Sequence, residues 1–176
     1  MRFQNVYLIG YRASGKTTLA EGVAQSSDLK FLDTDQMLQE NCGMSIDEMV
    51  SEHGWDYFRD IEEKTLADTA HMKGMIVATG GGIILRESNR ELLKKDKMLA
   101  VYLQAGADLI LSRLSSDPNP KQRPALSTSP LTSEVMSSLT QREPLYLECA
   151  DLVLDASKSI EDLVQKVLST FGHPVK

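Results

Sequence analysis

The chain has 176 residues, a length that indicates one domain large enough to enclose a hydrophobic core. Hydrophobic residues make up 41%, charged residues 25% and the net charge is −6, a globular composition that disfavours nucleic acid, whose binding relies on many neutralised phosphates. The apolar run before Gly10 is too short for a signal peptide or membrane span, and two cysteines outside metal-binding spacing fit free thiols, so we predict a cytoplasmic protein without a membrane partner.

Short apolar runs alternate with helical patterns along the chain. Five runs without polar alternation predict buried strands at residues 6–9, 31–32, 75–78, 99–103 and 152–154. Apolar residues recur at helical spacing after Thr17, from Phe58 to Met72 and from Ile160 to Phe171, where Ser159 is the expected N-cap. Strands that alternate with helices indicate an α/β fold with a parallel sheet in three layers.

The first predicted strand leads into Gly10-Tyr11-Arg12-Ala13-Ser14-Gly15-Lys16-Thr17, which fits the P-loop pattern G-x-x-x-x-G-K-[ST]. The glycines let backbone N–H groups face one anion, and the following helix adds the positive end of its dipole. Lys16 can reach the β- and γ-phosphates, and the Thr17 hydroxyl can ligate Mg²⁺. We therefore predict a site for a nucleoside triphosphate formed by Gly10, Arg12, Ala13, Ser14, Gly15, Lys16, Thr17 and Thr18.

Acidic residues follow the second predicted strand, in Asp33-Thr34-Asp35. Ligands collect at the carboxyl ends of parallel strands, so these carboxylates could hold Mg²⁺ through water and orient a hydroxyl group for attack. The alternative is structural: Asp33 or Thr34 would cap a helix, with Asp35 in its first turn.

Three glycines, Gly80-Gly81-Gly82, follow the third predicted strand. They permit positive φ and a close approach of ligand to backbone, so the triplet is a candidate substrate contact. A flexible turn between strand and helix is the alternative.

Arg59 lies beside the apolar stripe of a predicted helix, with Glu62 and Glu63 at ion-pair spacing. Oriented by a glutamate, this arginine could grip an anionic substrate with two parallel hydrogen bonds. A solvated surface ion pair, which contributes little stability, is the alternative.

The segment from Ser115 to Pro130 contains four prolines, which predicts a loop and, at this length, a lid. Arg123 within it could close on the transferred phosphoryl group. Arg142 precedes Pro144, which indicates a kink or a helix start. Arg113 could stack on a base, because guanidinium is planar and weakly hydrated. Exposure to solvent is the alternative for each of these arginines.

Together these motifs resemble the shikimate kinase family in order and spacing over nearly the whole chain. The segments that carry the resemblance are Gly10 to Thr17, Asp33-Thr34-Asp35, Phe58-Arg59-Asp60-Ile61-Glu62, Gly80-Gly81-Gly82, Gln122-Arg123-Pro124-Ala125-Leu126 and Gln141-Arg142-Glu143-Pro144-Leu145-Tyr146. The resemblance implies a three-layer α/β/α P-loop NTPase fold with a five-stranded parallel sheet and a lid loop, in one domain. It implies a monomer that uses ATP and Mg²⁺ to convert shikimate to shikimate 3-phosphate, in chorismate and aromatic amino acid biosynthesis.

The resemblance also implies roles for single residues. Lys16, Asp35 and Arg123 would be catalytic, with Asp35 holding the shikimate hydroxyls and taking the proton of the attacking one. Arg59 and Arg142 would clamp the carboxylate, with Glu62 orienting Arg59. The other expected contacts are Gly80, Gly81 and Gly82 for substrate, Thr17 and Asp33 for the metal, and Arg113, Arg123 and Lys158 for ATP. Many relatives carry smaller residues inside the P-loop, so Arg12 would add either a phosphate contact or a surface charge.

Two other interpretations share part of this pattern. Another small-metabolite kinase of the same fold, such as a gluconate kinase, would also need a P-loop, a lid and an anion clamp. A domain that binds ATP without catalysis is the second. The P-loop indicates that a nucleotide binds but not which reaction follows. The residues that bind the phosphate acceptor must therefore distinguish these interpretations.

Overall fold

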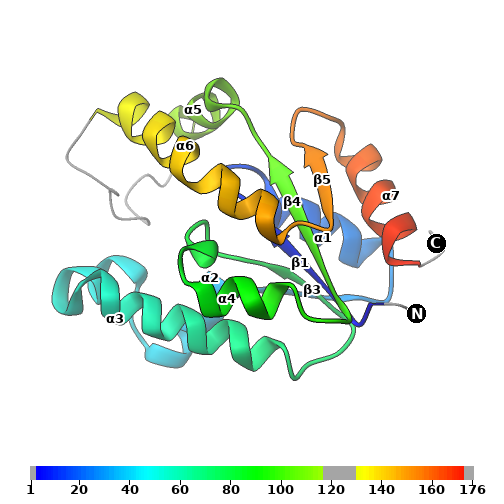
Figure 1. The fold of residues 1–176 in the computed structure, drawn as a ribbon, viewed down its shortest axis with the longest axis horizontal. Helices are drawn as coiled ribbons and strands as arrows, with labels where there is room; N and C mark the ends of the chain where they lie inside the picture. The colour runs from blue at the N-terminus through cyan, green and yellow to red at the C-terminus, as the bar shows by residue number, and fades with distance from the viewer. Residues whose placement is uncertain (1–2, 117–129, 173–176) are drawn as a thin grey trace.

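Five parallel strands form the centre of the computed structural model, which describes residues 3–116 and 130–172 (Figure 1). They are β1 (Asn5–Ile9), β2 (Lys30–Asp33), β3 (Met75–Ala78), β4 (Met98–Gln104) and β5 (Leu152–Asp155). The strands lie in the order β2-β3-β1-β4-β5, and each neighbouring pair is parallel. All five predicted strands are confirmed, and each extends at most one residue beyond its apolar run at either end.

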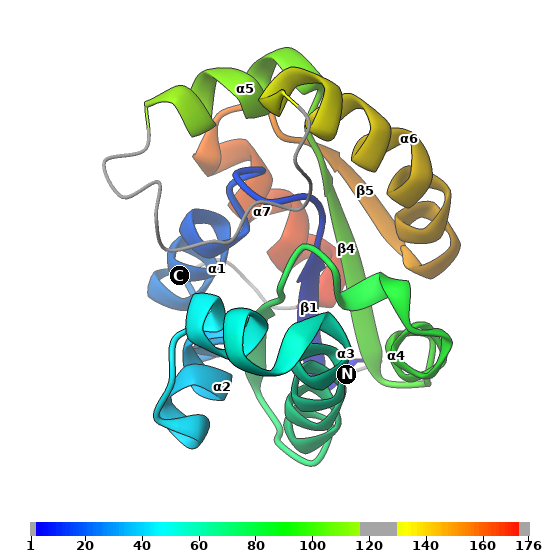
Figure 2. The ribbon, with the colours of Figure 1, turned by 90° about the vertical axis from the view of Figure 1, so that its left-hand side faces the viewer.

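Helices cover both faces of this sheet (Figures 1 and 2). They are α1 (Lys16–Gln25), α2 (Thr34–Cys42), α3 (Ile46–Thr69), α4 (Glu87–Leu93), α5 (Ala107–Ser115), α6 (Leu131–Cys149) and α7 (Ile160–Phe171), with a 3₁₀ helix η1 (Ile83–Leu85) before α4. Alternate residues of β1 serve the two faces: Val6 and Leu8 pack in the core with α1 and α7, whereas Tyr7 and Ile9 pack with α3, α4 and α6. The predicted three-layer α/β/α fold is therefore confirmed.

A sharp break in α3 creates a third, smaller core. Gly54 has φ 84° and ψ 172°, so the helix changes direction there. The part before Gly54 packs against α2, and the two helices bury Leu38, Ile46, Met49 and Phe58 between them. This arrangement places the start of α3 over the carboxyl ends of the strands, where the candidate site lies.

The prediction that Pro144 marks a helix start is wrong. Helix α6 begins after Pro130 and runs to Cys149 with Pro144 inside it. Proline removes one backbone donor, but Tyr146 and Cys149 are buried in the core just beyond it, and this packing offsets the loss. Residues 117–129, which include Arg123 and most of the predicted lid, lie outside the described residues.

The structure also bears on the two cysteines and on membrane-spanning helices. Cys42 and Cys149 are free thiols, as predicted. In the part of the chain that the structure describes, no helix has the length and apolar character needed to cross a bilayer.

Candidate active site

The predicted phosphate-binding loop joins β1 to α1. Gly10 and Gly15 have φ values of 147° and 103°, which glycine adopts without steric penalty. A Cβ atom at Gly10 would also lie 2.7 Å from the carbonyl oxygen of Leu103, so the loop packs closely on β4. Helix α1 begins at Lys16 behind Gly15, which has no side chain to cap the first N–H groups. The first N–H groups of α1 and the helix dipole make the loop suitable for phosphate.

Lys16 is folded back over this loop. Its Nζ donates hydrogen bonds to the carbonyl oxygens of Gly10 and Tyr11, both at 2.8 Å, and the side chain is buried. Its ammonium group therefore lies within the loop itself, where it can meet phosphate oxygens.

The two carboxylate oxygens of Asp33 accept hydrogen bonds from different parts of the chain. Its Oδ1 accepts hydrogen bonds from the N–H groups of Asp35 at 2.9 Å and Gln36 at 3.2 Å, which caps α2. Its Oδ2 accepts a hydrogen bond from the Thr17 hydroxyl at 3.2 Å. The structural interpretation is thus confirmed for Asp33, and it leaves one carboxylate oxygen beside the P-loop hydroxyl. Such a pair of oxygen donors fits Mg²⁺.

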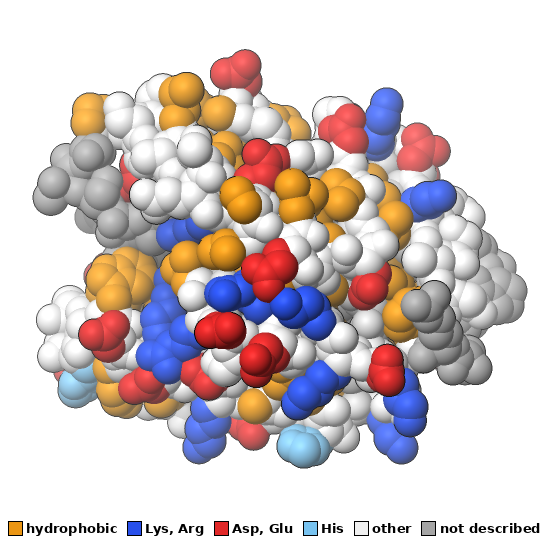
Figure 3. Space-filling view, in the orientation of Figure 1, with side chains coloured by type: hydrophobic (Ala, Val, Ile, Leu, Met, Phe, Trp, Pro, Cys, Tyr) orange, Lys and Arg blue, Asp and Glu red, His pale blue; other side chains and the backbone are white. Residues whose placement is uncertain are grey.

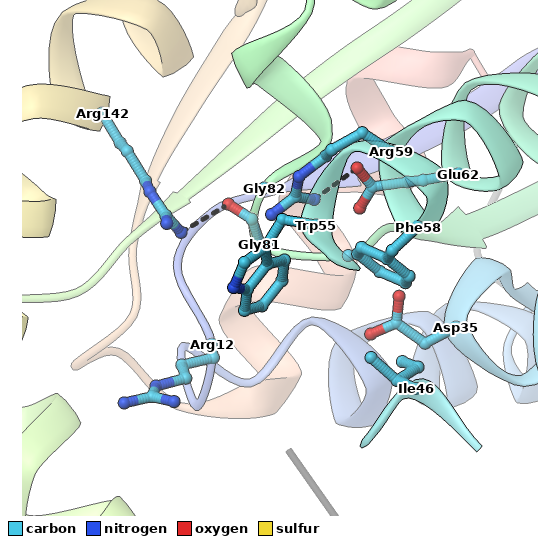
Figure 4. Close-up of a pocket in the computed structure, with 11 residues that line it drawn as sticks. Arg12, Asp35, Ile46, Trp55, Phe58, Arg59, Glu62, Gly81, Gly82 and Arg142 are labelled. Carbon is cyan, nitrogen blue, oxygen red and sulfur yellow. Dashed lines mark hydrogen bonds and ion pairs between the residues drawn. The ribbon is translucent and has the colours of Figure 1, made fainter. Parts of the chain in front are cut away.

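A pocket opens between the P-loop, α3 and the turn after β3 (Figure 4). The residues that line it are Arg12, Asp35, Ile46, Trp55, Phe58, Arg59, Glu62, Gly80, Gly81, Gly82 and Arg142. Every residue that the sequence assigned to the substrate lies in this set, although these residues come from separate elements. The aromatic and aliphatic wall formed by Ile46 and Trp55 was not predicted, although Trp55 lies one helical turn from Arg59 and this spacing could have indicated a contact.

Arg59 is fixed by a buried carboxylate and two rings. Its Nη1 lies 2.5 Å from Glu62 Oε2, and the two side chains are only 13% and 1% exposed. Its guanidinium carbon lies 5.4 Å from the centroid of Trp55 and 5.0 Å from that of Phe58. The solvated surface pair is therefore the wrong interpretation for Arg59 and Glu62. Glu63 instead pairs with Arg86, and that pair is partly exposed, with about a third of each side chain open to solvent.

Burial raises the pKa of Glu62 above its ordinary 4.5, while Arg59 and Arg142 oppose the rise and Asp35 adds to it. A raised pKa means that the folded protein binds this proton more tightly than the unfolded chain does. The stabilisation from the bound proton is full below 4.5 and is lost as the pH rises through the folded pKa.

The loss of this stabilisation with rising pH gives a prediction for Glu62→Gln, whose neutral side chain does not titrate. The difference in free energy of unfolding, variant minus parent, should move in favour of the variant as the pH rises from about 4 to 7. Urea midpoints across that range measure the difference, and groups common to both proteins cancel. A difference that stays flat, or moves the other way, would contradict the raised pKa.

The glycine triplet provides space rather than unusual backbone angles, since none of the three adopts the positive φ that glycine permits. A Cβ atom on Gly80 would lie 2.7 Å from both Asp35 Oδ1 and Glu62 Oε1. A Cβ on Gly81 would lie 3.0 Å from the backbone nitrogen of the P-loop Arg12. A Cβ on Gly82 would overlap the guanidinium nitrogens of Arg59. The triplet therefore lets two carboxylates, the P-loop and an arginine converge on one turn.

Gly82→Ala should for this reason displace Arg59 rather than unfold the protein, because the guanidinium is the movable end of a long side chain. We expect weaker binding of an anionic acceptor by roughly 10-fold, the effect of disturbing one charge-assisted hydrogen bond, with little change for ATP. The matched control is Gly106→Ala, because a Cβ there meets nothing within 4 Å. Titrations of both ligands measure the effect, and equal losses for ATP and acceptor would rule out this explanation.

The pocket arginines differ in how their charges are compensated. Arg12 forms an ion pair with Glu134 of α6, and their side chains are 13% and 4% exposed. Arg59 is paired with Glu62. Arg142 donates a hydrogen bond, 3.4 Å long, to the carbonyl oxygen of Gly81 and also contacts the Tyr146 hydroxyl, and no described carboxylate lies within ion-pair distance of it. The pocket therefore keeps one arginine without a direct ion pair among the described residues, beside Arg59, which suits a small anion.

Arg113 and Lys158 lie on the other side of the P-loop. The guanidinium of Arg113 donates to the carbonyl oxygens of Ser14 at 2.5 Å and of Ala156 at 3.3 Å, so it joins the P-loop to the turn after β5. Lys158 is exposed on that same turn. Their contacts with adenine stay predictions, as does the phosphate contact of Arg12, which the structure places on the acceptor side. Sequence reasoning missed Glu134 as the ion-pair partner of Arg12, and no local pattern indicates a partner so distant in the chain.

Comparisons with known proteins agree with this geometry. A family model described as shikimate kinase matches residues 12–171. The chain is 38% identical over 165 residues to a shikimate kinase 2 of Yersinia enterocolitica, covering 94% of each protein. Its structure is similar to that of a shikimate kinase from Acinetobacter baumannii in complex with shikimate, with a TM-score of 0.88, 32% identity and coverage of 96% and 92% of the two chains. A shikimate kinase from Bacteroides thetaiotaomicron gives a TM-score of 0.86 at 27% identity, with coverage of 95% and 97%.

Proposed function

Because the chain belongs to the shikimate kinase family, ATP-dependent kinases that phosphorylate a hydroxyl group, we propose that its pocket binds shikimate and directs the 3-hydroxyl at ATP. The observation that carries the proposal is the composition of the pocket beside the P-loop. Arg59 and Arg142, which has no direct ion pair among the described residues, line it together with Asp35. The product would be shikimate 3-phosphate, the intermediate passed on toward chorismate and the aromatic amino acids.

The acceptor would lie with its carboxylate at the two arginines. Arg59 would present a guanidinium already oriented by Glu62, and Arg142 would supply a second guanidinium that forms no direct ion pair with a described carboxylate. The apolar wall of Ile46, Trp55 and Phe58 would face the carbon ring, and the backbone of the glycine triplet would approach its edge. Charge-assisted hydrogen bonds at one end and hydroxyl recognition at the other would select a hydroxylated carboxylate.

Asp35 would orient the attacking hydroxyl and accept its proton. The residue lies in the first turn of α2, fixed there by the Asp33 cap, and it lines the pocket. Phosphoryl transfer asks the protein mainly for positioning and for stabilisation of charge. Lys16 would supply part of that stabilisation, and Arg123, outside the described residues, would add the rest from the lid.

Mg²⁺ would be held beside the triphosphate by the Thr17 hydroxyl directly and by Asp33 through water. These groups fit the ion because they are oxygen donors within 3.2 Å of each other at the start of α1. When bound, the ion neutralises charge on the β- and γ-phosphates. We further propose that the protein works as a monomeric single domain in the cytoplasm.

A coupled assay of ADP release tests this function. The full-length protein is incubated with Mg²⁺ and ATP and then with shikimate, gluconate or a nucleoside monophosphate in turn. We expect ADP release above the ATPase background with shikimate alone among these acceptors. Turnover with gluconate or a nucleoside monophosphate instead, or no response to any acceptor, would reject the proposal.

A further inference from the structure

Tyr11 is a P-loop residue whose ring lies against two arginines of the acceptor pocket. The guanidinium carbon of Arg142 is 5.5 Å from the ring centroid, and that of Arg12 is 5.8 Å from it. We propose that Tyr11 is a positioning residue, which holds Arg142 in place for the carboxylate of the acceptor through this cation–π contact. The inference rests on the acceptor site proposed above.

The position of the ring is set by the donor side of the site. The backbone oxygen of Tyr11 accepts hydrogen bonds from Lys16 Nζ at 2.8 Å and from the N–H of Ser14 at 3.2 Å. Its side chain is 1% exposed and packs in the core with α1, α5 and α6. The ring is therefore a rigid surface, fixed by the same loop that would hold the phosphates.

Arg142 needs such a support because its other polar contacts are with neutral groups, the carbonyl oxygen of Gly81 and the hydroxyl of Tyr146. Its hydrogen bond to Gly81 O is 3.4 Å long, and the same oxygen accepts a 2.5 Å hydrogen bond from the Tyr146 hydroxyl. A carboxylate partner would fix the guanidinium but would also neutralise it. The face of an aromatic ring attracts the cation and leaves its charge available. The Tyr11 ring can thus hold the Arg142 guanidinium in place and leave its charge available. A side chain that binds a carboxylate needs both properties.

The ring, and not the hydroxyl, carries this role. The Tyr11 hydroxyl oxygen is buried and has no hydrogen-bond partner among the described residues. Tyr11→Phe should therefore keep the KM for shikimate within about 2-fold of the parent, since the π-face stays in place. A hydroxyl role would instead appear as a loss in this conservative variant.

The decisive experiment replaces Tyr11 by phenylalanine and by phenylalanine analogues carrying one, two or three ring fluorines. Fluorine withdraws electron density from the ring face while its shape changes little, so the attraction for a cation weakens stepwise. We expect the KM for shikimate to rise with each fluorine, reaching about 5- to 10-fold, while the KM for ATP stays constant. A purely structural role of the ring would give no such gradient.

A pair of double variants separates the two arginines. In the background of Arg142→Met, replacing Tyr11 by the trifluorinated residue should change kcat/KM for shikimate by less than about 2-fold, because its target is gone. In the background of Arg12→Met the full effect should persist. A flat fluorine series, or an effect lost with Arg12 rather than Arg142, would overturn the inference. Failure of the proposed function is a separate outcome, seen when the parent protein does not phosphorylate shikimate.

Discussion

Asp35→Asn is expected to lower kcat for shikimate phosphorylation by about 10²- to 10⁴-fold, the usual contribution of a general base. The amide keeps the size of the side chain but cannot take a proton from the attacking hydroxyl. The Asp33 cap uses the backbone N–H of residue 35, so α2 should fold as before. Steady-state kinetics with shikimate measure the loss of kcat, and calorimetric titration of ADP measures separately whether the nucleotide site is intact.

The matched control for this variant is Asp47→Asn. Asp47 also lies in the first turn of a helix, α3, but it is exposed. Its substitution should leave turnover within about 2-fold of the parent, as for most surface changes. If Asp35→Asn kept full turnover, Asp35 would have no role in proton transfer. If it lost ADP binding as well, the defect would be structural.

Arg59→Ala should affect both acceptor binding and folding. Losing hydrogen bonds from a charged group to the carboxylate costs about 3 kcal/mol in all, which corresponds to an increase of roughly 100-fold in the KM for shikimate. The variant also leaves Glu62 buried without its partner, and breaking a buried ion pair costs about 3–5 kcal/mol of stability. We expect a lower urea midpoint together with the raised KM, and little change in the KM for ATP.

A second substitution separates these two losses. Adding Glu62→Gln to Arg59→Ala removes the stranded charge, so most of the stability should return. Acceptor binding should not return, because the guanidinium is still missing. Arg86→Ala is the control, because Arg86 lies just before α4 and forms partly exposed pairs with Asp60 and Glu63 of α3 that should contribute little. Recovery of shikimate binding in the double variant would contradict a direct role for Arg59.

The sequence predicted the layers, the strands and the P-loop because each depends on residues close together in the chain. Buried strands need apolar runs of a few residues, and the phosphate loop needs two glycines, a lysine and a hydroxyl at fixed spacing. The pairing of Arg59 with Glu62 is also local, one turn of helix apart. Its burial is not local, since it depends on α3 lying against the turn after β3.

Features that depend on distant contacts were missed or misread. Arg12 and Glu134 form an ion pair between the P-loop and α6, and nothing near either residue marks the other. The glycine triplet suggested backbone freedom, whereas the structure requires space for side chains from α2 and α3. Pro144 suggested a kink or a helix start, and the helix start is wrong because packing of α6 on the sheet outweighed the local preference of proline. Local sequence therefore predicts which side chains are functional better than it predicts the distant residues that position them.

The most direct test of the account is a crystal structure of the full-length protein with Mg²⁺, ADP and shikimate bound. We predict that the shikimate carboxylate lies within hydrogen-bond distance of both Arg59 and Arg142. Its 3-hydroxyl should lie within about 3.2 Å of Asp35 and face the P-loop. Shikimate bound with its carboxylate away from these arginines, or with another hydroxyl directed at the phosphates, would contradict the account.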